Sequence, residues 1–525
     1  MESLAEQAAA VPRQRVGALH RADEDGAVKH SVEVDWVLLG LLAVAFSVRV
    51  AAILVFPSIY HPDENFQAFE QAHRLAFGYG IVPWEFVAGI RSPVLPFIFA
   101  AIFRLSAPFV GGPQGYLIVA RLLLAAASLV AVAAVYRMGR RTSPAHGLVG
   151  GLVAATWFEF VYFAGRPLTE AIATTVFLLA LTLASVPEDK FTFRRLVAIG
   201  FTLGLCLMIR VHLAAGLFVI AVWVGRLSLR TRWWPMTLGA AIPLAVFGVA
   251  DWIAWGGFFH SYVEAVRANL VQGRASHFGT EPSQWYAEQL YSQWKFALAP
   301  LAVFIFVRVR AAAMWILAAL VIIAIHSAIP HKEYRFILPA CACLVIVAAM
   351  GSADLLERAG RLVRPLVHRG LVFSAALLWV EISVALASAP QFEQKWFKAR
   401  QYIMASFALT EKTDLCGLLF YDNFWFNTGG YAHLHRNVPF YSLREDETVK
   451  PEKSSSSFNA VVLTRSFVPD FVPRFHIQQC FSSPVSEDVC LLVRDGSCIY
   501  EKDMDVFLAP GTSLLGVDEP TGPTK

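Results

Sequence analysis

The sequence has little charge for its length. Of its 525 residues only 16% are charged, against about 25% in an average soluble protein, and 56% are hydrophobic. Soluble domains stop enlarging a single core at about 250–300 residues, so no soluble packing hides this much apolar surface. The net charge of +4 is too small to indicate a polyanionic partner. These shortages exclude a water-soluble enzyme, a disordered protein and a nucleic-acid-binding protein, and they predict a polytopic all-α membrane protein.

Cysteine is also sparse, and the seven cysteines form two groups. Cys206, Cys341 and Cys343 lie in apolar segments, where we expect them to serve packing. The other four lie in the polar C-terminal region, at Cys416, Cys480, Cys490 and Cys498. An even set of four permits disulfides in an oxidising compartment, but the spacing does not give their pairing. No Cys or His spacing resembles a zinc site. We predict that no metal and no cofactor is required.

Apolar runs that are long enough, or nearly long enough, to span a membrane recur along residues 36–390. They fall at 36–56, 94–110, 116–136, 145–163, 168–186, 196–211, 212–225, 236–256, 298–310, 311–329, 336–355 and 370–389. Five basic clusters punctuate them, and the positive-inside rule places these clusters on the cytoplasmic side. From residue 137 onward this rule gives outer loops at 257–297 and 330–335 and places everything after 390 outside. For the first third we expect a polar cytoplasmic tail over 1–35 and an outer loop at 57–93, which depends on the run at 94–110.

The run at 94–110 leaves two topologies open. If it spans, residues 57–93 lie inside and the N-terminus lies outside, whereas a re-entrant or surface segment reverses both. The run has only 17 residues, begins near Pro93 and Pro96, and carries Arg104. These features favour the second topology, which gives about eleven spans.

The last part of the chain changes character. Charged residues, Asn, Ser and aromatics rise over 391–510, and short β-rich runs appear at 460–464 and 489–493. This composition predicts a small α/β domain on the outer face, followed by a loose tail over 511–525.

The most informative segment follows the first span and begins His61-Pro-Asp-Glu64. Read as a helix from Pro62, it places Asp63, Gln67 and Glu70 on one face and apolar side chains on the other. This pattern is typical of an amphipathic helix in the membrane interface, whose polar face would look into a cavity.

Two interpretations of Asp63 and Glu64 compete. Acids in the first turn after a proline are ordinary helix-start chemistry, worth about 0.3–1 kcal/mol per charge. However, a carboxylate pair beside a hydrocarbon boundary, next to His61 and followed by Trp84 and Glu85, is costly without a function. The context favours a functional pair.

Cations gather in a second segment, Pro330–Pro339. His331, Lys332, Glu333 and Arg335 crowd a short turn between two apolar helices. Snorkelling at the membrane surface is one explanation, but outward cations beside an acid favour a bound anion such as a phosphate. Further intramembrane candidates are Arg166, Arg210 and His212, whereas an internal ion pair explains Glu170 about as well.

Two separated motifs, His61-Pro-Asp-Glu64 and His331-Lys-Glu-Tyr-Arg-Phe336, carry a resemblance to a known family. With Phe66-Gln67, Glu70, His73 and Phe77-Gly-Tyr-Gly80 leading to Trp84, they resemble the lipid-phosphate-sugar-dependent mannosyltransferases of glycosyltransferase family 22, and most of all its branch of third GPI mannosyltransferases. The likeness covers roughly residues 36–390. Tyr334 departs from it, because relatives often carry another acid there.

The resemblance implies a GT-C fold with an active site on the outer membrane face. It implies an inverting transfer of mannose from a polyprenyl- or dolichyl-phosphate donor to a glycan or glycolipid, forming an α-glycoside. Asp63, or its neighbour Glu64, is then the catalytic carboxylate. Lys332 and Arg335 are expected at the donor phosphate, and His61, Gln67, Glu70, Trp84, Arg166, Arg210, His212, His331 and Glu333 around the substrates.

A transporter or flippase of an anionic lipid-linked sugar is the alternative function. It explains the spans and the outward cations equally well, but not the carboxylate pair or the outer-face domain, and transporters tend to show internal repeats that are not visible here. The excess of Arg (33) over Lys (11) favours a bacterial inner membrane over the endoplasmic reticulum.

Overall fold

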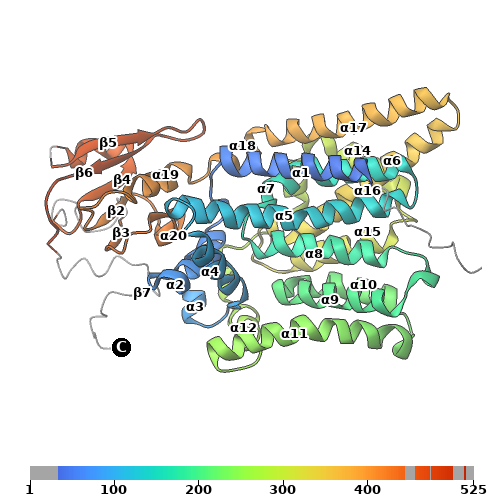
Figure 1. Cartoon of the computed structure of the whole chain (residues 1–525), viewed down its shortest axis with the longest axis horizontal. Helices are drawn as coiled ribbons and strands as arrows, with labels where there is room; N and C mark the ends of the chain where they lie inside the picture. The colour runs from blue at the N-terminus through green and yellow to red at the C-terminus, as the bar shows by residue number, and fades with distance from the viewer. Residues whose placement is uncertain (1–33, 444–455, 473, 500–512, 516–525) are drawn as a thin grey trace, which may run out of the picture. The chain divides into compact units, whose positions relative to one another are not determined.

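Long apolar helices dominate the computed structural model, which describes residues 34–443, 456–472, 474–499 and 513–515. Six helical segments within these residues are long and apolar enough to cross a membrane. They are α1 Trp36–Val55, α5 Gly112–Arg140, Leu229–Trp255 with α11 (Trp234–Trp255), Trp285–Arg308 with α13 (Trp285–Trp294) and α14 (Leu298–Arg308), Tyr334–Gly360 with α16 (Leu338–Gly360), and α17 Pro365–Ala387. Figure 1 shows α1, α5, α11, α14, α16 and α17 running alongside one another.

The other apolar helices are bent or short. A pair, α6 (Pro144–Thr156) and α7 (Phe158–Ala164), bends by 51° and makes a seventh candidate span if it is counted as one. The shorter helices are α4 Val94–Ser106, α8 Thr169–Ala184, α9 Phe193–Ile209, α10 Ala214–Gly225 and α15 Ala313–Ala328. The polytopic helical fold is thus confirmed, whereas the number of about eleven spans stays a prediction.

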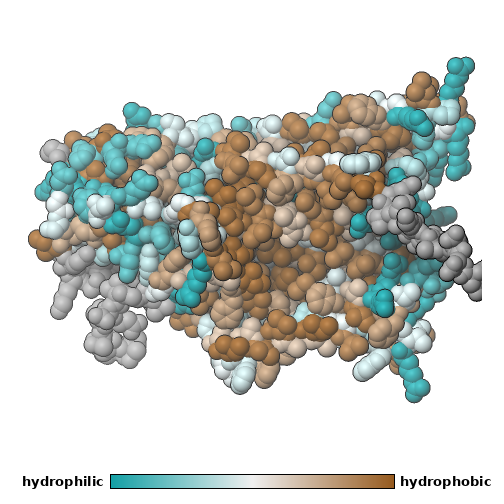
Figure 2. Space-filling view, viewed as in Figure 1, coloured by the Kyte–Doolittle hydropathy of each residue, from teal (hydrophilic) through white to brown (hydrophobic). Residues whose placement is uncertain are grey.

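Surface hydropathy agrees with membrane embedding. Figure 2 shows hydrophobic residues over the middle of the helical part, with hydrophilic residues gathered toward both ends. A belt of apolar surface between two polar regions is what a bilayer about 30 Å thick requires of the protein that crosses it. The segment Tyr334–Gly360, which contains α16, lies at the centre of the helical part. Within its apolar stretch, 89% of the residues are buried inside the protein.

The first loop folds into short elements beside the ends of the long helices (Figure 1). These are a π-helical turn Glu64–Phe69, α2 Glu70–Phe77, β1 Gly80–Val82 and α3 Trp84–Val87. Gly78 ends α2 with a φ of 92°, a left-handed conformation that glycine adopts without a steric penalty. The strand β1 pairs antiparallel with β7 (Ser513–Leu515), which falls inside the predicted loose tail.

The segment at 257–297, which was predicted as an outer loop, is also helical. It contains α12 (His260–Val266), a π-helical turn Arg267–Val271, a 3₁₀ turn Arg274–Phe278 and the start of the α13 segment. The predicted N-terminal tail lies outside the described residues, except at its last two positions.

The predicted C-terminal α/β fold is present. Helices α18 (Pro390–Phe397) and α19 (Arg400–Leu409) lead into a five-stranded sheet of order β3-β2-β4-β6-β5. The strands are β2 Leu418–Tyr421, β3 Phe440–Leu443, β4 Ala460–Thr464, β5 His476–Phe481 and β6 Val489–Val493. The strands β4 and β6 have the bounds predicted from the sequence. Parallel pairing of β2 with β3 and β4 requires crossovers, and the first of them contains a 3₁₀ turn, Trp425–Asn427, and α20, Gly430–Leu434.

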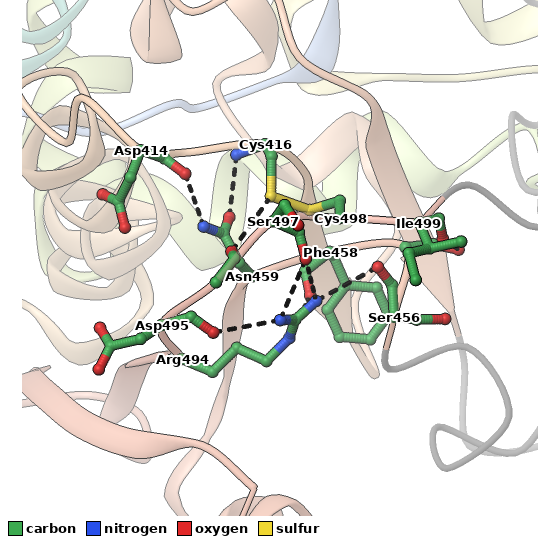
Figure 3. The surroundings of a disulfide bond; sticks show 12 residues. Asp414, Cys416, Ser456, Phe458, Asn459, Arg494, Asp495, Ser497, Cys498 and Ile499 are labelled. Carbon is green, nitrogen blue, oxygen red and sulfur yellow. Dashed lines mark hydrogen bonds between the residues drawn. A yellow bond between two sulfur atoms is a disulfide. The ribbon is translucent and has the colours of Figure 1, made fainter.

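Two disulfides cross-link this domain. They join Cys416 to Cys498 and Cys480 to Cys490, which settles the pairing that the spacing left open. Figure 3 shows Asn459 beside the first bond: its Oδ1 accepts the Cys416 N–H at 3.0 Å, and its Nδ2 donates to the Asp414 carbonyl at 2.7 Å. The bond closes a long loop around the sheet and so restricts the unfolded chain.

A buried arginine of α1 caps the bend between α6 and α7. Arg49 is 2% exposed, and its two Nη atoms donate to the carbonyls of Ala155 at 2.7 Å and Ala154 at 3.1 Å. Its Nε donates to Ser128 Oγ at 2.9 Å. A helix leaves its last carbonyls unpaired, so Arg49 satisfies groups that apolar surroundings would leave without partners.

Replacing Arg49 with Leu is expected to lower the thermal unfolding midpoint in detergent. Each buried carbonyl left without a donor costs about 1–3 kcal/mol. The Arg49→Lys variant, which keeps one cationic donor, should fall between wild type and Arg49→Leu. Equal midpoints for all three proteins would show that water or lipid satisfies the bend.

Candidate active site

Asp63 stands at the start of the first-loop helix. The backbone of Asp63 is already helical, and its carboxylate Oδ1 lies 3.3 Å from His61 Nδ1. Pro62 before it fixes a backbone angle suited to a helix start. The carboxylate therefore projects from a defined position rather than from a free loop.

Arg335 brings the second motif into direct contact with the first. Its Nη2 donates to Asp63 Oδ2 at 2.6 Å, across 272 positions of sequence. Its Nε donates to Glu333 Oε2 at 2.7 Å, and its Nη1 lies 3.3 Å from Glu170 Oε1. With only 3% of the residue exposed, the guanidinium is enclosed by three carboxylates.

These groups border one cavity of about 780 Å³ at the ends of the apolar helices. This volume lies in the range of small-molecule sites. Ten of the thirteen site residues predicted from the sequence line it: His61, Asp63, Gln67, Trp84, Arg210, His212, His331, Lys332, Glu333 and Arg335. The structure thus gathers residues from the first loop, the break between α9 and α10, and the basic turn around one space.

Glu64, the predicted alternative to Asp63, does not line this cavity. Its carboxylate is 1% exposed and lies 2.9 Å from Nη1 of Arg166, another predicted site residue outside the cavity. The backbone N–H of Tyr60 also donates to it. Arg166 in turn donates to Ser58 Oγ at 2.7 Å. This pair joins the first loop to the start of α8.

Glu70 is the third predicted residue that the structure places outside the cavity. Its carboxylate accepts the backbone N–H groups of Ile81 at 2.8 Å, Tyr431 at 3.2 Å and Ala432 at 2.8 Å. The expected common face with Asp63 assumed 3.6 residues per turn, but residues 64–69 form a wider π-helical turn. Burial raises the pKa of Glu70 to about 7, although the three N–H donors oppose this rise.

Electrostatics keep the rim of the cavity charged. Burial alone would raise the pKa of Asp63, but the Arg335 guanidinium and His61 hold it well below its usual range. The same cation and two histidines hold the pKa of Glu333 low against its burial. For His61, burial and Arg335 lower the pKa, but Asp63 and hydrogen bonds to Asp63 and Glu333 raise it to about 9. At neutral pH the two carboxylates are ionised and His61 is protonated.

Lys332 differs from the other cations that line the cavity. Its Nζ donates to two backbone carbonyls, Glu281 at 2.8 Å and Ile329 at 2.5 Å. Arg210 lies 2.8 Å from Glu170, and Arg91 lies 3.9 Å from Glu85. Among the described residues, Lys332 has no carboxylate within ion-pair distance, so its charge is available to an incoming anion.

Some residues that line the cavity were not among the site residues predicted from the sequence. Glu170 was expected as easily in an internal ion pair, and it pairs with both Arg210 and Arg335. Trp425 and Phe426 come from the C-terminal domain, and no local pattern links them to the first loop. Only the tertiary fold brings them there.

No group of three or more His, Cys, Asp or Glu side chains arranged to hold a metal ion occurs among the described residues. That the reaction needs no metal or cofactor stays a prediction. The lining of carboxylates, guanidinium groups and an ammonium group suits proton transfer and the binding of an anion.

Comparison with known proteins identifies the family. The model of the Alg9-like mannosyltransferase family matches residues 41–435, which is most of the chain and includes both motifs. The chain belongs to the Alg9-like mannosyltransferase family. The predicted assignment to glycosyltransferase family 22 and to the mannosyltransferases is therefore confirmed. Membership in an enzyme family speaks against the transporter alternative.

Several curated relatives are named as third GPI mannosyltransferases. GPI mannosyltransferase 3 of Yarrowia lipolytica is 24% identical over 414 residues, which cover 77% of this chain and 76% of that protein. Mannosyltransferase APTG1 of Arabidopsis thaliana is 26% identical, over 60% of this chain and 58% of that protein. Human GPI alpha-1,2-mannosyltransferase 3 is 23% identical, over 57% of this chain and 55% of that protein.

Solved structures support the fold. ArnT from Cupriavidus metallidurans, in a crystal structure bound to undecaprenyl phosphate, superposes with a TM-score of 0.58. The match covers 86% of this chain and 97% of ArnT at 13% identity. The GT-C type of fold expected from the motifs is thereby supported, including the multi-span membrane part.

Proposed function

We propose that this mannosyltransferase moves mannose from a polyprenyl- or dolichyl-phosphate donor to a glycan or glycolipid acceptor, with inversion, to form an α-mannoside. The single observation that carries the proposal is the contact between Asp63 and Arg335 in the cavity. It sets a carboxylate that can take a proton beside cations that can hold a phosphate, at the ends of apolar helices where a lipid-linked donor would lie.

Asp63 is the proposed general base. An acceptor hydroxyl oxygen attacks the anomeric carbon, and the bond from that carbon to the phosphate oxygen breaks. The hydroxyl proton passes to Asp63, and the bonding electrons leave with the lipid phosphate. Inverting glycosidases use a carboxylate in the same way, to activate the nucleophile on the face opposite the leaving group. The position of Glu64, buried against Arg166, favours Asp63 over it.

Lys332, Arg335 and Arg210 are the proposed phosphate-binding cations. A phosphate that approaches Arg335 competes with Asp63 for the same guanidinium, since Nη2 holds that carboxylate at 2.6 Å. Donor binding would therefore loosen the Asp63 ion pair and make its carboxylate a stronger base. Negative charge that develops on the leaving phosphate would be stabilised by cations already in place.

The active site is proposed to face the non-cytoplasmic side of the membrane, in the bacterial inner membrane rather than the endoplasmic reticulum. The first-loop helix and the C-terminal domain meet at the cavity. The positive-inside rule assigns the C-terminal domain to the outer side, and the first loop then lies on the same side. The two disulfides of the C-terminal domain support an oxidising compartment.

The test uses purified full-length protein in detergent, where transport has no meaning. Radiolabelled mannosyl phosphates of dolichol and of undecaprenol are offered with short α-mannosides that carry an octyl tail, and GDP-mannose serves as the control donor. We expect transfer from at least one lipid-phosphate donor to a product that α-mannosidase cleaves, and none from GDP-mannose. Transfer from GDP-mannose alone, or no transfer from either lipid donor, would refute the proposal.

A further inference from the structure

A loop of the C-terminal domain forms part of the catalytic cavity. Trp425 and Phe426, in the crossover between β2 and β3, line the same space as Asp63. Trp425 packs edge-on against Phe66 of the first loop, with ring centroids 4.6 Å apart. We propose that this aromatic pair is the acceptor subsite, which binds a neutral hexose ring of the acceptor glycan; the inference rests on the proposed function.

The loop is held in place by several independent contacts. Asn65 Nδ2 donates to the Gly429 carbonyl at 2.9 Å, and Tyr116 Oη donates to the Ala432 carbonyl at 3.0 Å. The Glu70 carboxylate accepts the N–H groups of Tyr431 and Ala432. Gly430 has a φ of +58°, and a Cβ there would lie 2.6 Å from Glu70 Oε2. A segment fixed so closely can offer a preformed surface to a ligand.

The chemistry of this side of the cavity fits a sugar better than a phosphate. An aromatic ring packs against the apolar C–H face of a hexose, while neighbouring amide and carboxylate groups bind its hydroxyls. Gln67 and Glu85 supply such groups, and they are joined by a hydrogen bond of 3.1 Å. Both line the cavity, and Gln67 follows Asp63 by four residues on the same helical segment.

The proposed donor groups come from different elements. Arg210 lies between α9 and α10, and Lys332 lies in the turn after α15, all of them apolar helices. Met208 and Phe247 add apolar surface to the cavity from α9 and α11. The lipid-linked donor is thus expected among the helix ends, and the acceptor sugar at the wall formed by the first loop and the C-terminal domain, with Asp63 between them.

The test compares acceptor and donor kinetics in full-length variants. Wild type, Trp425→Ala, Trp425→Phe and Phe426→Ala are assayed with the mannosyl phosphate donor and with octyl α-mannoside or octyl mannobioside. Binding of the same octyl glycosides, in the presence of dolichyl phosphate, is measured by saturation-transfer NMR. Ile477→Ala, a half-exposed residue of β5 that does not line the cavity, is the control in the same domain.

Trp425→Ala is expected to raise KM for the acceptor by about tenfold while KM for the donor stays the same, and Trp425→Phe should recover most of the loss. A Trp425→Ala protein that binds the glycosides as wild type does would overturn the inference, as would equal changes of both KM values. Absence of glycoside binding by wild type would also overturn it. Failure of the proposed function looks different, because wild type would then transfer no mannose from lipid donors.

Discussion

Replacing Asp63 with Asn is expected to slow mannose transfer by about 10²- to 10⁴-fold, the contribution typical of a general base. Asn keeps the size of the side chain and an oxygen that can accept the Arg335 N–H, but it cannot take the proton of the attacking hydroxyl. Because Arg335 retains Glu333 and Glu170 as partners, the fold should hold. We expect a lower kcat and a thermal unfolding midpoint close to that of wild type. Dolichyl phosphate should bind at least as tightly as to wild type, because the carboxylate that competes for Arg335 has lost its charge.

Glu64→Gln is the matched control one residue away. Its expected defect is in stability, since it would leave Arg166 buried without a counter-charge, a change that typically costs about 3–5 kcal/mol. Folded Glu64→Gln protein should turn over at a rate near that of wild type. A full rate for Asp63→Asn would remove it as the base, and a large loss of kcat in well-folded Glu64→Gln would move the role to Glu64.

Local pattern predicted much of this site because its residues cluster in two short segments. The first segment holds His61, Asp63 and Gln67 within seven residues. The second holds His331, Lys332 and Arg335 within five residues. Their excess of charge at hydrocarbon boundaries is visible in sequence alone, since such charge is costly without a partner. The sequence did not show which residue pairs with each of these charged groups.

Partner choice depends on contacts that sequence patterns do not encode. Glu70 was expected in the cavity, but a π-helical turn rotates it toward backbone N–H groups of the C-terminal domain. Trp425 reaches the cavity over 362 positions from Asp63, through a crossover between parallel strands. The number of spans is equally hard to predict, because α8 and α10 are apolar but shorter than the roughly 20 residues that a straight helix needs to cross a bilayer.

Replacing Lys332 with Ala is the second change from which we expect a large effect, and its signature differs from that of Asp63→Asn. Lys332 is the cavity cation whose partners, among the described residues, are backbone carbonyls alone. Loss of one charge-assisted hydrogen bond to a phosphate corresponds to roughly a 10- to 100-fold rise in KM for the lipid-phosphate donor. The acceptor KM should stay within about twofold of wild type, because the cation does not contact the acceptor in the proposed arrangement.

Lys332→Arg and Lys412→Ala complete this experiment. Arginine keeps the charge, but its planar fork does not reproduce a compact ammonium group held between two carbonyls, so we expect only partial recovery. Lys412 pairs with Asp414 in the C-terminal domain, away from the cavity lining, and its loss should leave both KM values unchanged. If Lys332→Ala lowered kcat with an unchanged donor KM, the cation would act on the transition state alone. Wild-type KM values for Lys332→Ala would leave Arg335 and Arg210 as the phosphate-binding groups. The donor phosphate would then have to displace the Asp63 carboxylate from Arg335 in order to bind.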